Sequence, residues 1–129
     1  MPGRARLDPA PTRPKTAAMS HFAPLPVPPY HAVIFTAQRR EGDRGYAEMS
    51  AEMSALAERQ PGYLGMESSR DGEGFGITVS YWADEAALLN WKAVAKHLMA
   101  QRLGRTRWYS HYRIRVARVE RAYEGPEGR

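Results

Sequence analysis

The chain has no cysteine among its 129 residues, and only two of its ten prolines lie beyond residue 29. The absence of thiols excludes disulfides, thiolate metal ligands and cysteine nucleophiles, and it suits a reducing compartment. Long hydrophobic runs are missing too, because no apolar stretch approaches the ~20 residues that a membrane-spanning helix requires. The length is sufficient for one domain. From these three observations we expect a single-domain, cytoplasmic protein that does not bind membranes.

The first 29 residues form a separate segment by composition. They hold eight of the ten prolines, which excludes a regular helix or a central strand because proline has no backbone N–H. The segment also lacks the apolar core of a secretory signal. We therefore predict a flexible N-terminal arm over residues 1–29, a folded domain over residues 30–124 and a short C-terminal tail over residues 125–129.

The folded part is less basic than the net charge of +5 suggests. Residues 1–29 carry four basic side chains and one acidic one, so a net charge of +2 remains after Pro29. A nucleic-acid-binding domain gathers its basic residues on one face, and we expect no nucleic-acid partner. The densest basic stretch is a set of seven arginines between residues 102 and 121. It is either a site for an anionic ligand or a solvated surface that pairs with acids such as Glu48 and Glu52.

The first half of the folded part predicts a strand followed by a helix. Residues 31–37 are β-branched and aromatic, which indicates a strand that is apolar on both faces. Between residues 44 and 60, side chains recur at helical spacing and predict an amphipathic helix. We expect Pro61 and Gly62 to end it. The stripe that faces the core consists of Tyr46, Met49, Met53, Leu56 and Gln60.

The next part predicts a β-hairpin. Residues 63–70 and 75–82 read as strands, because the acids and glycines of residues 71–74 suit a tight turn. In the second of these strands, the large residues at 75, 77, 79 and 81 alternate with mostly small ones. This alternation predicts that something packs closely against the small face.

The last part predicts a second helix and a final strand. Asp84 is the expected N-cap of a helix whose buried stripe includes Leu88, Trp91 and Leu98, and Gly104 is the expected stop. The final strand runs from about residue 108 to residue 123. Its apolar positions change from even to odd numbers near Ala117, which predicts a bulge or a change of strand partner there.

The element order β-α-β-β-α-β predicts an α+β, ferredoxin-like fold with both helices on one side of an antiparallel sheet. The other sheet face then needs a cover, because the first strand is apolar on both faces and a large exposed apolar patch marks an interface. We therefore expect a homodimer, in which residues 119–123 of the final strand reach the partner subunit.

Several short motifs resemble those of one known family. They are the turn Gln60-Pro61-Gly62, residues 76–82 (Gly-Ile-Thr-Val-Ser-Tyr-Trp), the run Asn90-Trp91-Lys92, the pair His97-Leu98 and residues 104–109. Over about residues 30–124 the chain resembles the antibiotic biosynthesis monooxygenase domain. The resemblance implies a dimeric α/β barrel, in which two ferredoxin-like sheets pack face to face. The family includes cofactor-independent oxygenases that convert polyphenolic aromatics to quinones, haem-degrading enzymes and proteins without a known substrate.

The resemblance favours an oxygenase that acts on a small aromatic or quinone-like molecule with neither metal nor flavin. An electron-rich phenolate can pass an electron directly to dioxygen, so the site must bind the ring, remove a proton and stabilise charge. The catalytic candidates are Asn90, Trp91, His97 and Gln38, and the candidate walls of the substrate site are Phe35, Tyr81, Trp82 and Trp108. In the alternative interpretation the tryptophans are core residues and His97 lies on the surface.

The haem-degrading branch implies a different role for the second helix. It resembles this chain in the pair Asn90-Trp91 and ligates iron through a later histidine, for which His97 is the nearest candidate. On an α-helix, His97 lies about 240° around the axis from Trp91. It therefore faces away from the buried stripe, and we predict no iron ligation by His97. The four histidines show no spacing typical of a metal site, so we expect no metal.

A non-catalytic ligand-binding or stress-response protein with the same barrel is the remaining alternative. An open cavity with Asn90, Trp91 or His97 in its wall favours the enzyme. A cavity filled by Met49, Met53 and Trp91 favours the non-catalytic protein. The two alternatives therefore differ in whether the space between the sheet and the helices is open.

Overall fold

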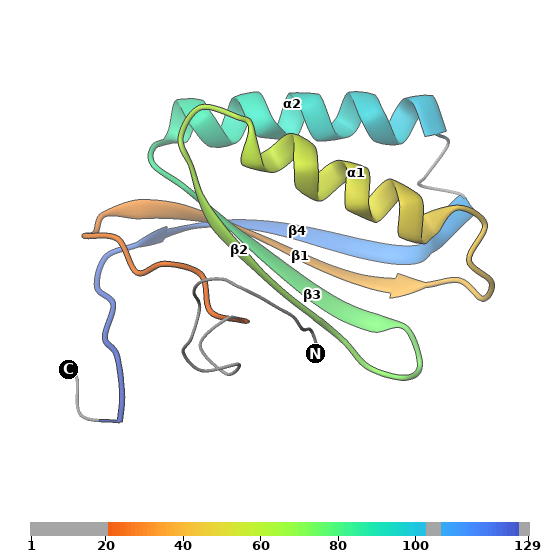
Figure 1. Cartoon of the computed structure of the whole chain (residues 1–129), viewed down its shortest axis with the longest axis horizontal. Coiled ribbons are helices and arrows are strands. Elements are labelled where there is room, and N and C mark those ends of the chain that lie inside the picture. The colour runs from red at the N-terminus through yellow and green to blue at the C-terminus, as the bar shows by residue number, and fades with distance from the viewer. Residues whose placement is uncertain (1–20, 103–106, 127–129) are drawn as a thin grey trace, which may run out of the picture.

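Two helices lie on one face of a four-stranded antiparallel sheet in the computed structural model, which describes residues 21–102 and 107–126 (Figure 1). The elements are β1 (Tyr30–Arg39), α1 (Tyr46–Glu58), β2 (Tyr63–Arg70), β3 (Phe75–Trp82), α2 (Glu85–Arg102) and β4 (Tyr109–Val119). The strand order β2-β3-β1-β4 is that of the predicted ferredoxin-like fold. Residues 1–20 of the predicted arm, the predicted helix stop at Gly104 and the last three residues of the tail lie outside the described residues.

Local turn chemistry defines the element ends. Asp84 is the N-cap of α2 as predicted, because its Oδ1 accepts a hydrogen bond from the backbone N–H of Ala87 at 2.8 Å. In the β2–β3 hairpin, Asp71 Oδ1 accepts from the backbone N–H groups of Glu73 and Phe75 at 2.9 and 3.0 Å. Gly74 completes this turn with a φ of +91°, a value that glycine adopts readily.

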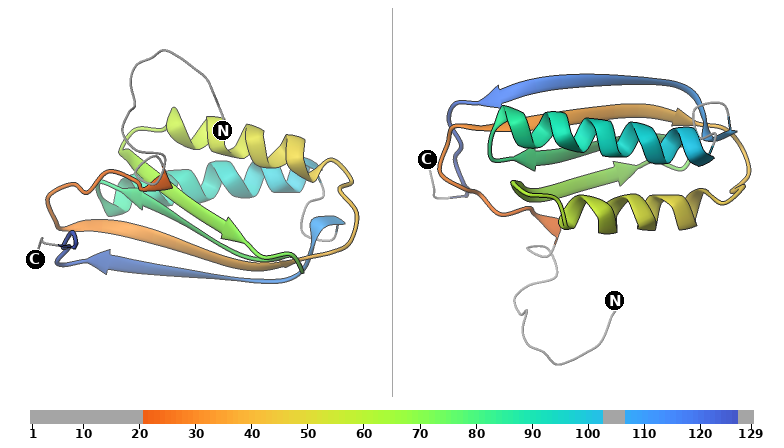
Figure 2. Two further views of the ribbon diagram at one scale, coloured as in Figure 1. Left: turned by 60° about the horizontal axis from the view of Figure 1, so that its bottom comes forward. Right: turned by 90° about the horizontal axis from the view of Figure 1, so that it is seen from above.

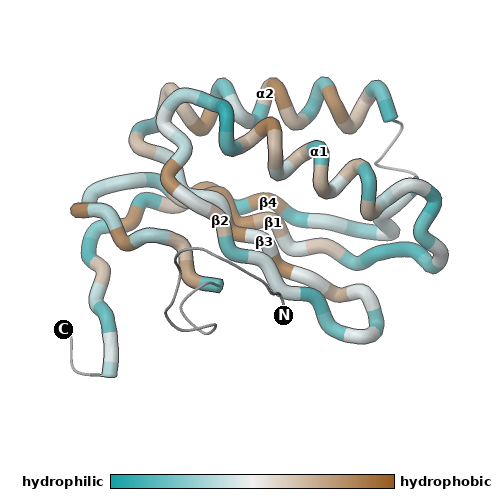
Figure 3. The backbone as a smooth tube through the Cα atoms, viewed as in Figure 1, coloured by the Kyte–Doolittle hydropathy of each residue, from teal (hydrophilic) through white to brown (hydrophobic). Residues whose placement is uncertain are grey.

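The predicted apolar stripes attach both helices to the sheet. From α2, Leu88, Trp91 and Leu98 are buried, and from α1 Met49 and Ala57 are buried. Along both helices, brown and teal segments alternate in Figure 3, as expected when one side packs on the sheet and the other is solvated. None of the described helices has the length and hydropathy needed to cross a membrane.

The pairing register decides which residues lie under the helices. Val33 of β1 stands opposite Ser80 of β3 and Val116 of β4, and Val33 belongs to the core beneath α2. Even-numbered residues of β3 and β4 therefore face the helices. The large residues of β3 point to the other side of the sheet, where Phe75 and Ile77 are 46% and 42% exposed. We call this side the open face.

The final strand differs from its prediction. It ends at Val119, and its pairing with β1 is unbroken from His111 to Val119, so the predicted bulge near Ala117 is wrong. The register shift lies at the other end of the strand, between Gln38 and Arg39 of β1. The apolar positions change parity because β4 is apolar on both sides near residue 117, and not because the pairing slips. Figure 2 shows β4 at the outer edge of the sheet, beyond α2.

Residues 21–29 cross the open face beside β2 (Figure 2), and we call them the N-terminal segment. The backbone N–H of Ala23 donates to Glu67 Oε2 at 2.9 Å. Gly65 permits the close approach, because a Cβ at this position would lie 2.9 Å from atoms of Ala23 and Pro24. The described end of the predicted arm therefore makes specific contacts with the domain.

Candidate functional site

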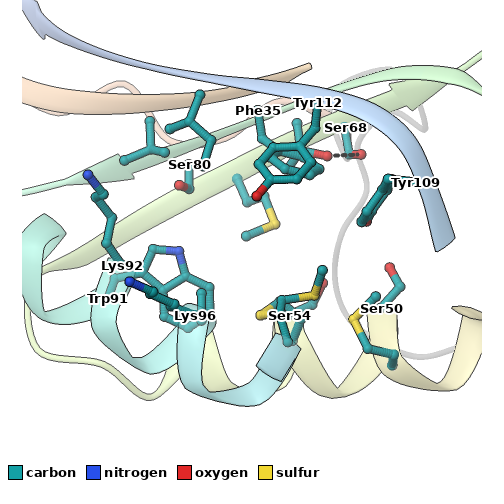
Figure 4. Close-up of a pocket in the computed structure, with 18 of the residues that line it drawn as sticks. Phe35, Ser50, Ser54, Ser68, Ser80, Trp91, Lys92, Lys96, Tyr109 and Tyr112 are labelled. Carbon is teal, nitrogen blue, oxygen red and sulfur yellow. Dashed lines mark hydrogen bonds between the residues drawn. The ribbon is translucent and has the colours of Figure 1, made fainter. Parts of the chain in front are cut away.

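A cavity of about 440 Å³ lies between the two helices and the sheet (Figure 4). Its walls are mainly apolar and aromatic, with methionines from both helices and from β2. α1 contributes Tyr46, Met49, Ser50, Met53 and Ser54, and α2 contributes Trp91, Lys92, Ala95, Lys96 and Met99. The sheet contributes Val33, Phe35, Met66, Ser68, Thr78, Ser80, Tyr109, Tyr112 and Ile114.

The small face of β3 makes the floor of this cavity. Thr78 and Ser80 leave space beneath the helices, and their hydroxyls are engaged within the floor. Thr78 Oγ1 lies 2.7 Å from Ser68 Oγ, and Ser80 Oγ accepts from Trp82 Nε1 at 2.9 Å. The predicted close packing occurs only at Gly76, where a Cβ would lie 2.8 Å from Arg70 Nη1. Over the rest of the strand that prediction is wrong, because the small side chains leave a cavity.

One end of the cavity is built around tyrosines and arginines. Tyr46 accepts a hydrogen bond from Arg70 Nη2 at 2.7 Å, and the guanidinium of Arg39 lies 3.6 Å from the centre of the Tyr46 ring. The hydroxyl of Tyr109 lies 3.5 Å from that of Tyr46. Burial, and then the hydrogen bond to Tyr46, raise the pKa of Tyr109. Tyr109 is therefore a protonated donor at neutral pH, next to two cations.

The middle of the cavity presents two hydrogen-bond donors. Figure 4 shows the Tyr112 hydroxyl and the Trp91 indole nitrogen pointing into the space. Neither atom has a hydrogen-bond partner within residues 21–102 and 107–126. Trp91 is backed by Trp82, and the Phe35 ring centre lies 5.6 Å from that of Tyr112. An aromatic ligand can therefore find both ring contacts and donors for an oxygen atom here.

Two lysines from α2 lie at the opposite end from Tyr109. Lys92 and Lys96 both line the cavity, and in Figure 4 the Lys92 side chain extends from the helix towards the sheet near Ser80. The described lining residues include no Asp, Glu, His or Cys. The charged groups that line the cavity are therefore cations.

Two of the eight predicted site residues, Trp91 and Phe35, line the cavity. Asn90 is exposed, and its Nδ2 donates to Gln60 Oε1 at 3.0 Å. Gln38 stabilises the β2–β3 hairpin, because its Nε2 donates to the carbonyl of Glu73 at 2.8 Å. His97 is exposed and does not line the cavity, which is the orientation expected from the helical geometry. The cavity lining therefore contains no histidine ligand for haem iron among the described residues.

The other three predicted aromatic walls lie elsewhere. Trp82 is fully buried behind Trp91, and Trp108 is buried in the second core cluster, where its Nε1 donates to the carbonyl of Arg44 at 2.9 Å. Tyr81 lies on the open face and donates to Glu67 Oε1 at 2.8 Å. The structure thus separates these three side chains from the cavity.

Sequence reasoning did not place Tyr109, Tyr112, Lys92 and Lys96 among the site residues, although all four line the cavity. Tyr109 and Tyr112 lie near the start of β4. The even-numbered apolar positions of this strand indicated only that Tyr112 shares a face with Ile114. Lys92 and Lys96 follow Trp91 by one and five positions, about 100° and 140° around the helix axis, so the helical period alone did not place them in the cavity. Of the basic stretch, Arg102 forms an ion pair with Glu52 of α1, as the solvated-surface interpretation expects. Arg105 lies outside the described residues.

Sequence comparison identifies the family. The profile of the family named antibiotic biosynthesis monooxygenase matches residues 29–103. The uncharacterised protein YqjZ of Bacillus subtilis is 46% identical over 103 residues, which cover 80% of this chain and 90% of YqjZ. A shorter match of 46 residues is 39% identical to a jasmonate monooxygenase of Pyricularia oryzae and covers 36% of this chain and 21% of that protein.

Solved structures show the same fold at low identity. SnoaB, a cofactor-independent oxygenase from Streptomyces nogalater, has a TM-score of 0.60 at 15% identity, covering 74% of this chain and 97% of SnoaB. NE2512, a protein of unknown function from Nitrosomonas europaea, has a TM-score of 0.59 at 20% identity, covering 78% of this chain and 97% of NE2512. The profile match and the identity with YqjZ lead to one conclusion: the chain belongs to the antibiotic biosynthesis monooxygenase family.

Proposed function

We propose that this protein is a cofactor-independent monooxygenase that oxidises a small phenolic aromatic molecule in the cavity between helices and sheet. The observation that carries the proposal is the pair of donors, Trp91 Nε1 and Tyr112 Oη, that point into an open, aromatic-walled cavity of about 440 Å³. This volume lies in the range of small-molecule sites, roughly 300–1,000 Å³. Family membership supports the reaction class, since SnoaB is a cofactor-independent oxygenase and the Pyricularia relative is a monooxygenase.

The cavity is suited to hold a phenolate. Its ring would contact Trp91, Phe35 and the methionine side chains, whose sulfur atoms make favourable contacts with aromatic rings. A hydrogen bond from the Tyr112 hydroxyl to the substrate oxygen favours the ionised form. The cations Arg39 and Arg70 stand behind Tyr46 at one end of the cavity and add positive potential there. The bound phenol would therefore ionise more easily than it does in water.

The proposed reaction needs no electron donor other than the substrate. The phenolate gives one electron to dioxygen, and the resulting superoxide combines with the substrate radical at a ring carbon that bears hydrogen to form a C–O bond. The peroxide then loses water as its O–O bond and the C–H bond at that carbon break, which leaves a quinone carbonyl. One oxygen atom of dioxygen enters the product and the other leaves as water, and the substrate supplies all four electrons.

Oxygen consumption with a probe substrate tests this function. Dithranol, a dihydroxyanthrone, should be converted to the anthraquinone, with one atom of isotopically labelled dioxygen found in the product. Tyr112→Phe should lower kcat/KM by about 10-fold or more, because it removes a hydrogen bond to a charged oxygen. Tyr63→Phe is the matched control, since Tyr63 lies on β2 outside the cavity lining. If no phenol in a panel of anthrones, naphthols and flavonoids is oxidised faster than in buffer, the proposal is wrong.

One observation favours a second function, a non-catalytic binding protein. The described lining residues offer no carboxylate or imidazole to act as a general base. A protein of this kind would bind phenols without consuming oxygen. Calorimetric binding of dithranol under nitrogen, together with the absence of oxygen uptake in air, would support this alternative.

The homodimer is part of the same proposal. The open face of the sheet carries Phe75 and Ile77, both more than two-fifths exposed, and the side chains of Ile34 and Val79 lie on the same face. Burial of these side chains against a second copy would remove apolar surface from water. The family resemblance implies the same face-to-face packing of two sheets.

A further inference from the structure

The two lysines of the cavity are one helical turn apart on α2. Lys92 and Lys96 both line the cavity at its exposed edge, in the helix row next to the one formed by Trp91 and Ala95. Like charges at this spacing repel each other and destabilise a helix. An acidic neighbour on the helix would normally offset the repulsion. The positions three or four residues away hold only Leu88, Leu89, Ala93, Ala95, Met99 and Ala100, apart from the two lysines themselves.

No acidic side chain from another element compensates these lysines in the described structure. The ion pairs of residues 21–102 and 107–126 join Arg102 to Glu52 and Arg118 to Glu120. The cavity lining contributes no carboxylate on the opposite side either. Both lysines are exposed and border the cavity without an ion-pair partner among the described residues, while the rest of the lining is mainly apolar.

This distribution matches a ligand with an anionic group at one end and an aromatic body. Two lysine side chains that start one helical turn apart can each donate a charge-assisted hydrogen bond to one oxygen of a carboxylate. Phosphate sites often use a helix N-terminus or an arginine fork, although lysine also binds phosphate. This end of the cavity has neither, since Lys92 and Lys96 lie in the middle of α2.

We propose that the natural ligand is an aromatic carboxylic acid whose carboxylate is bound by Lys92 and Lys96. The inference rests on the proposed function for the position of the substrate in the cavity, but it concerns binding and not oxidation. With the carboxylate at the lysine end, the ring lies beside Trp91 and its far edge points towards Tyr112 and Tyr109 (Figure 4). The lysines therefore determine which edge of the ring meets the tyrosine donors.

Calorimetry under nitrogen tests the inference independently of turnover. The probes are a hydroxynaphthoic acid and its methyl ester, which have the same ring and differ in charge. The wild-type protein should bind the acid at least about tenfold more tightly than the ester. The double variant Lys92→Gln/Lys96→Gln should bind both with the affinity of the ester, whereas Lys92→Arg/Lys96→Arg should keep the preference. Arg59→Gln is the matched control, because Arg59 is an exposed cation outside the cavity lining.

Two results would overturn the inference. One is equal affinity of the wild-type protein for the acid and the ester. The other is an equal loss of affinity for both probes in the glutamine variant, because this would indicate damage to the cavity and not loss of a charge contact. The outcome is separate from the proposed oxidation. A protein that shows the charge preference but consumes no oxygen would refute only the oxygenase proposal.

Discussion

The indole ring of Trp91 stacks on that of Trp82, with ring centres 5.6 Å apart and planes 19° from parallel. Trp82 is fully buried at the end of β3, so it gives Trp91 a rigid support. One face of Trp91 is thereby covered by protein, while its N–H points into the cavity. The pair links the hydrophobic core to the candidate site, and this link has a consequence for stability.

Trp82→Ala should lower the free energy of unfolding by about 3–5 kcal/mol, because it leaves a large void in a packed core. It should also weaken ligand binding, since Trp91 would lose its support. Urea denaturation measures the first effect and calorimetry the second. Leu89→Ala is the control, because Leu89 is 53% exposed on α2, and its unfolding free energy should change by no more than about 0.5 kcal/mol. A similar loss in both variants would contradict this prediction.

The pH dependence of stability should report on Tyr81. Burial and the hydrogen bond to Glu67 raise the pKa of Tyr81 to about 12, whereas tyrosine in the unfolded chain titrates near about 10. The unfolded chain therefore loses its proton first, so the contribution of Tyr81 is complete below about pH 10 and is lost as the pH rises towards 12. Between these values Tm should fall more steeply for the wild-type protein than for Tyr81→Phe. Equal slopes would show that the contact does not persist in solution.

Gly65 is expected to be essential for the position of the N-terminal segment. It has a φ of +154°, and an added Cβ would meet Ala23 and Pro24 at 2.9 Å. Gly65→Ala should displace residues 21–29 and break the hydrogen bond from Ala23 to Glu67. Chymotrypsin should then cleave faster after Phe22, with a lower Tm. Gly72→Ala is the control, since a Cβ there meets nothing within 4 Å, and unchanged cleavage in Gly65→Ala would refute the expectation.

Hemin titration checks the prediction about His97. Since the side chain is exposed and outside the cavity lining, the Soret band of hemin should show no sharp one-to-one shift that depends on His97. Spectra of the wild-type protein and of His97→Ala should therefore coincide. A shift in the wild-type protein that the substitution abolishes would favour haem degradation over aromatic oxidation.

Substitution on the open face tests the dimer. Ile77→Glu places a charge where the proposed interface is apolar, and it should convert a dimer to a monomer in analytical ultracentrifugation at micromolar concentration. Leu89→Glu adds the same charge at a similarly exposed site on α2 and should leave the mass unchanged. A wild-type protein that sediments only as a monomer would contradict the proposal.

The element types and their order were predictable because several local signals agree. Asp84 caps α2, and Leu88, Trp91 and Leu98 recur at the helical period and are all buried. The C-terminal end of β4 could not be predicted from whether its apolar positions have even or odd numbers. Ala117 and Val119 lie on the open face of an edge strand, where apolar side chains do not report a change of register.

The candidate site was predictable only where a residue lies on the inner side of its element. Trp91 and Phe35 meet this condition. Asn90 is adjacent to Trp91 in sequence, but successive residues on a helix point about 100° apart, and Asn90 reaches Gln60 instead. The contribution of Tyr109 depends on how the start of β4 lies over α1, which follows from tertiary packing and not from local pattern.

The four methionines of the lining, Met49, Met53, Met66 and Met99, have a consequence for the range of molecules that the cavity can take. Methionine is unbranched and has three rotatable bonds, so its side chain adapts to differently shaped neighbours at low energetic cost. Such walls adapt to the shape of the bound molecule and discriminate poorly between ring shapes. Selectivity must then come from the few polar side chains of the lining, and relatives that differ at those positions would accept different molecules within the same fold.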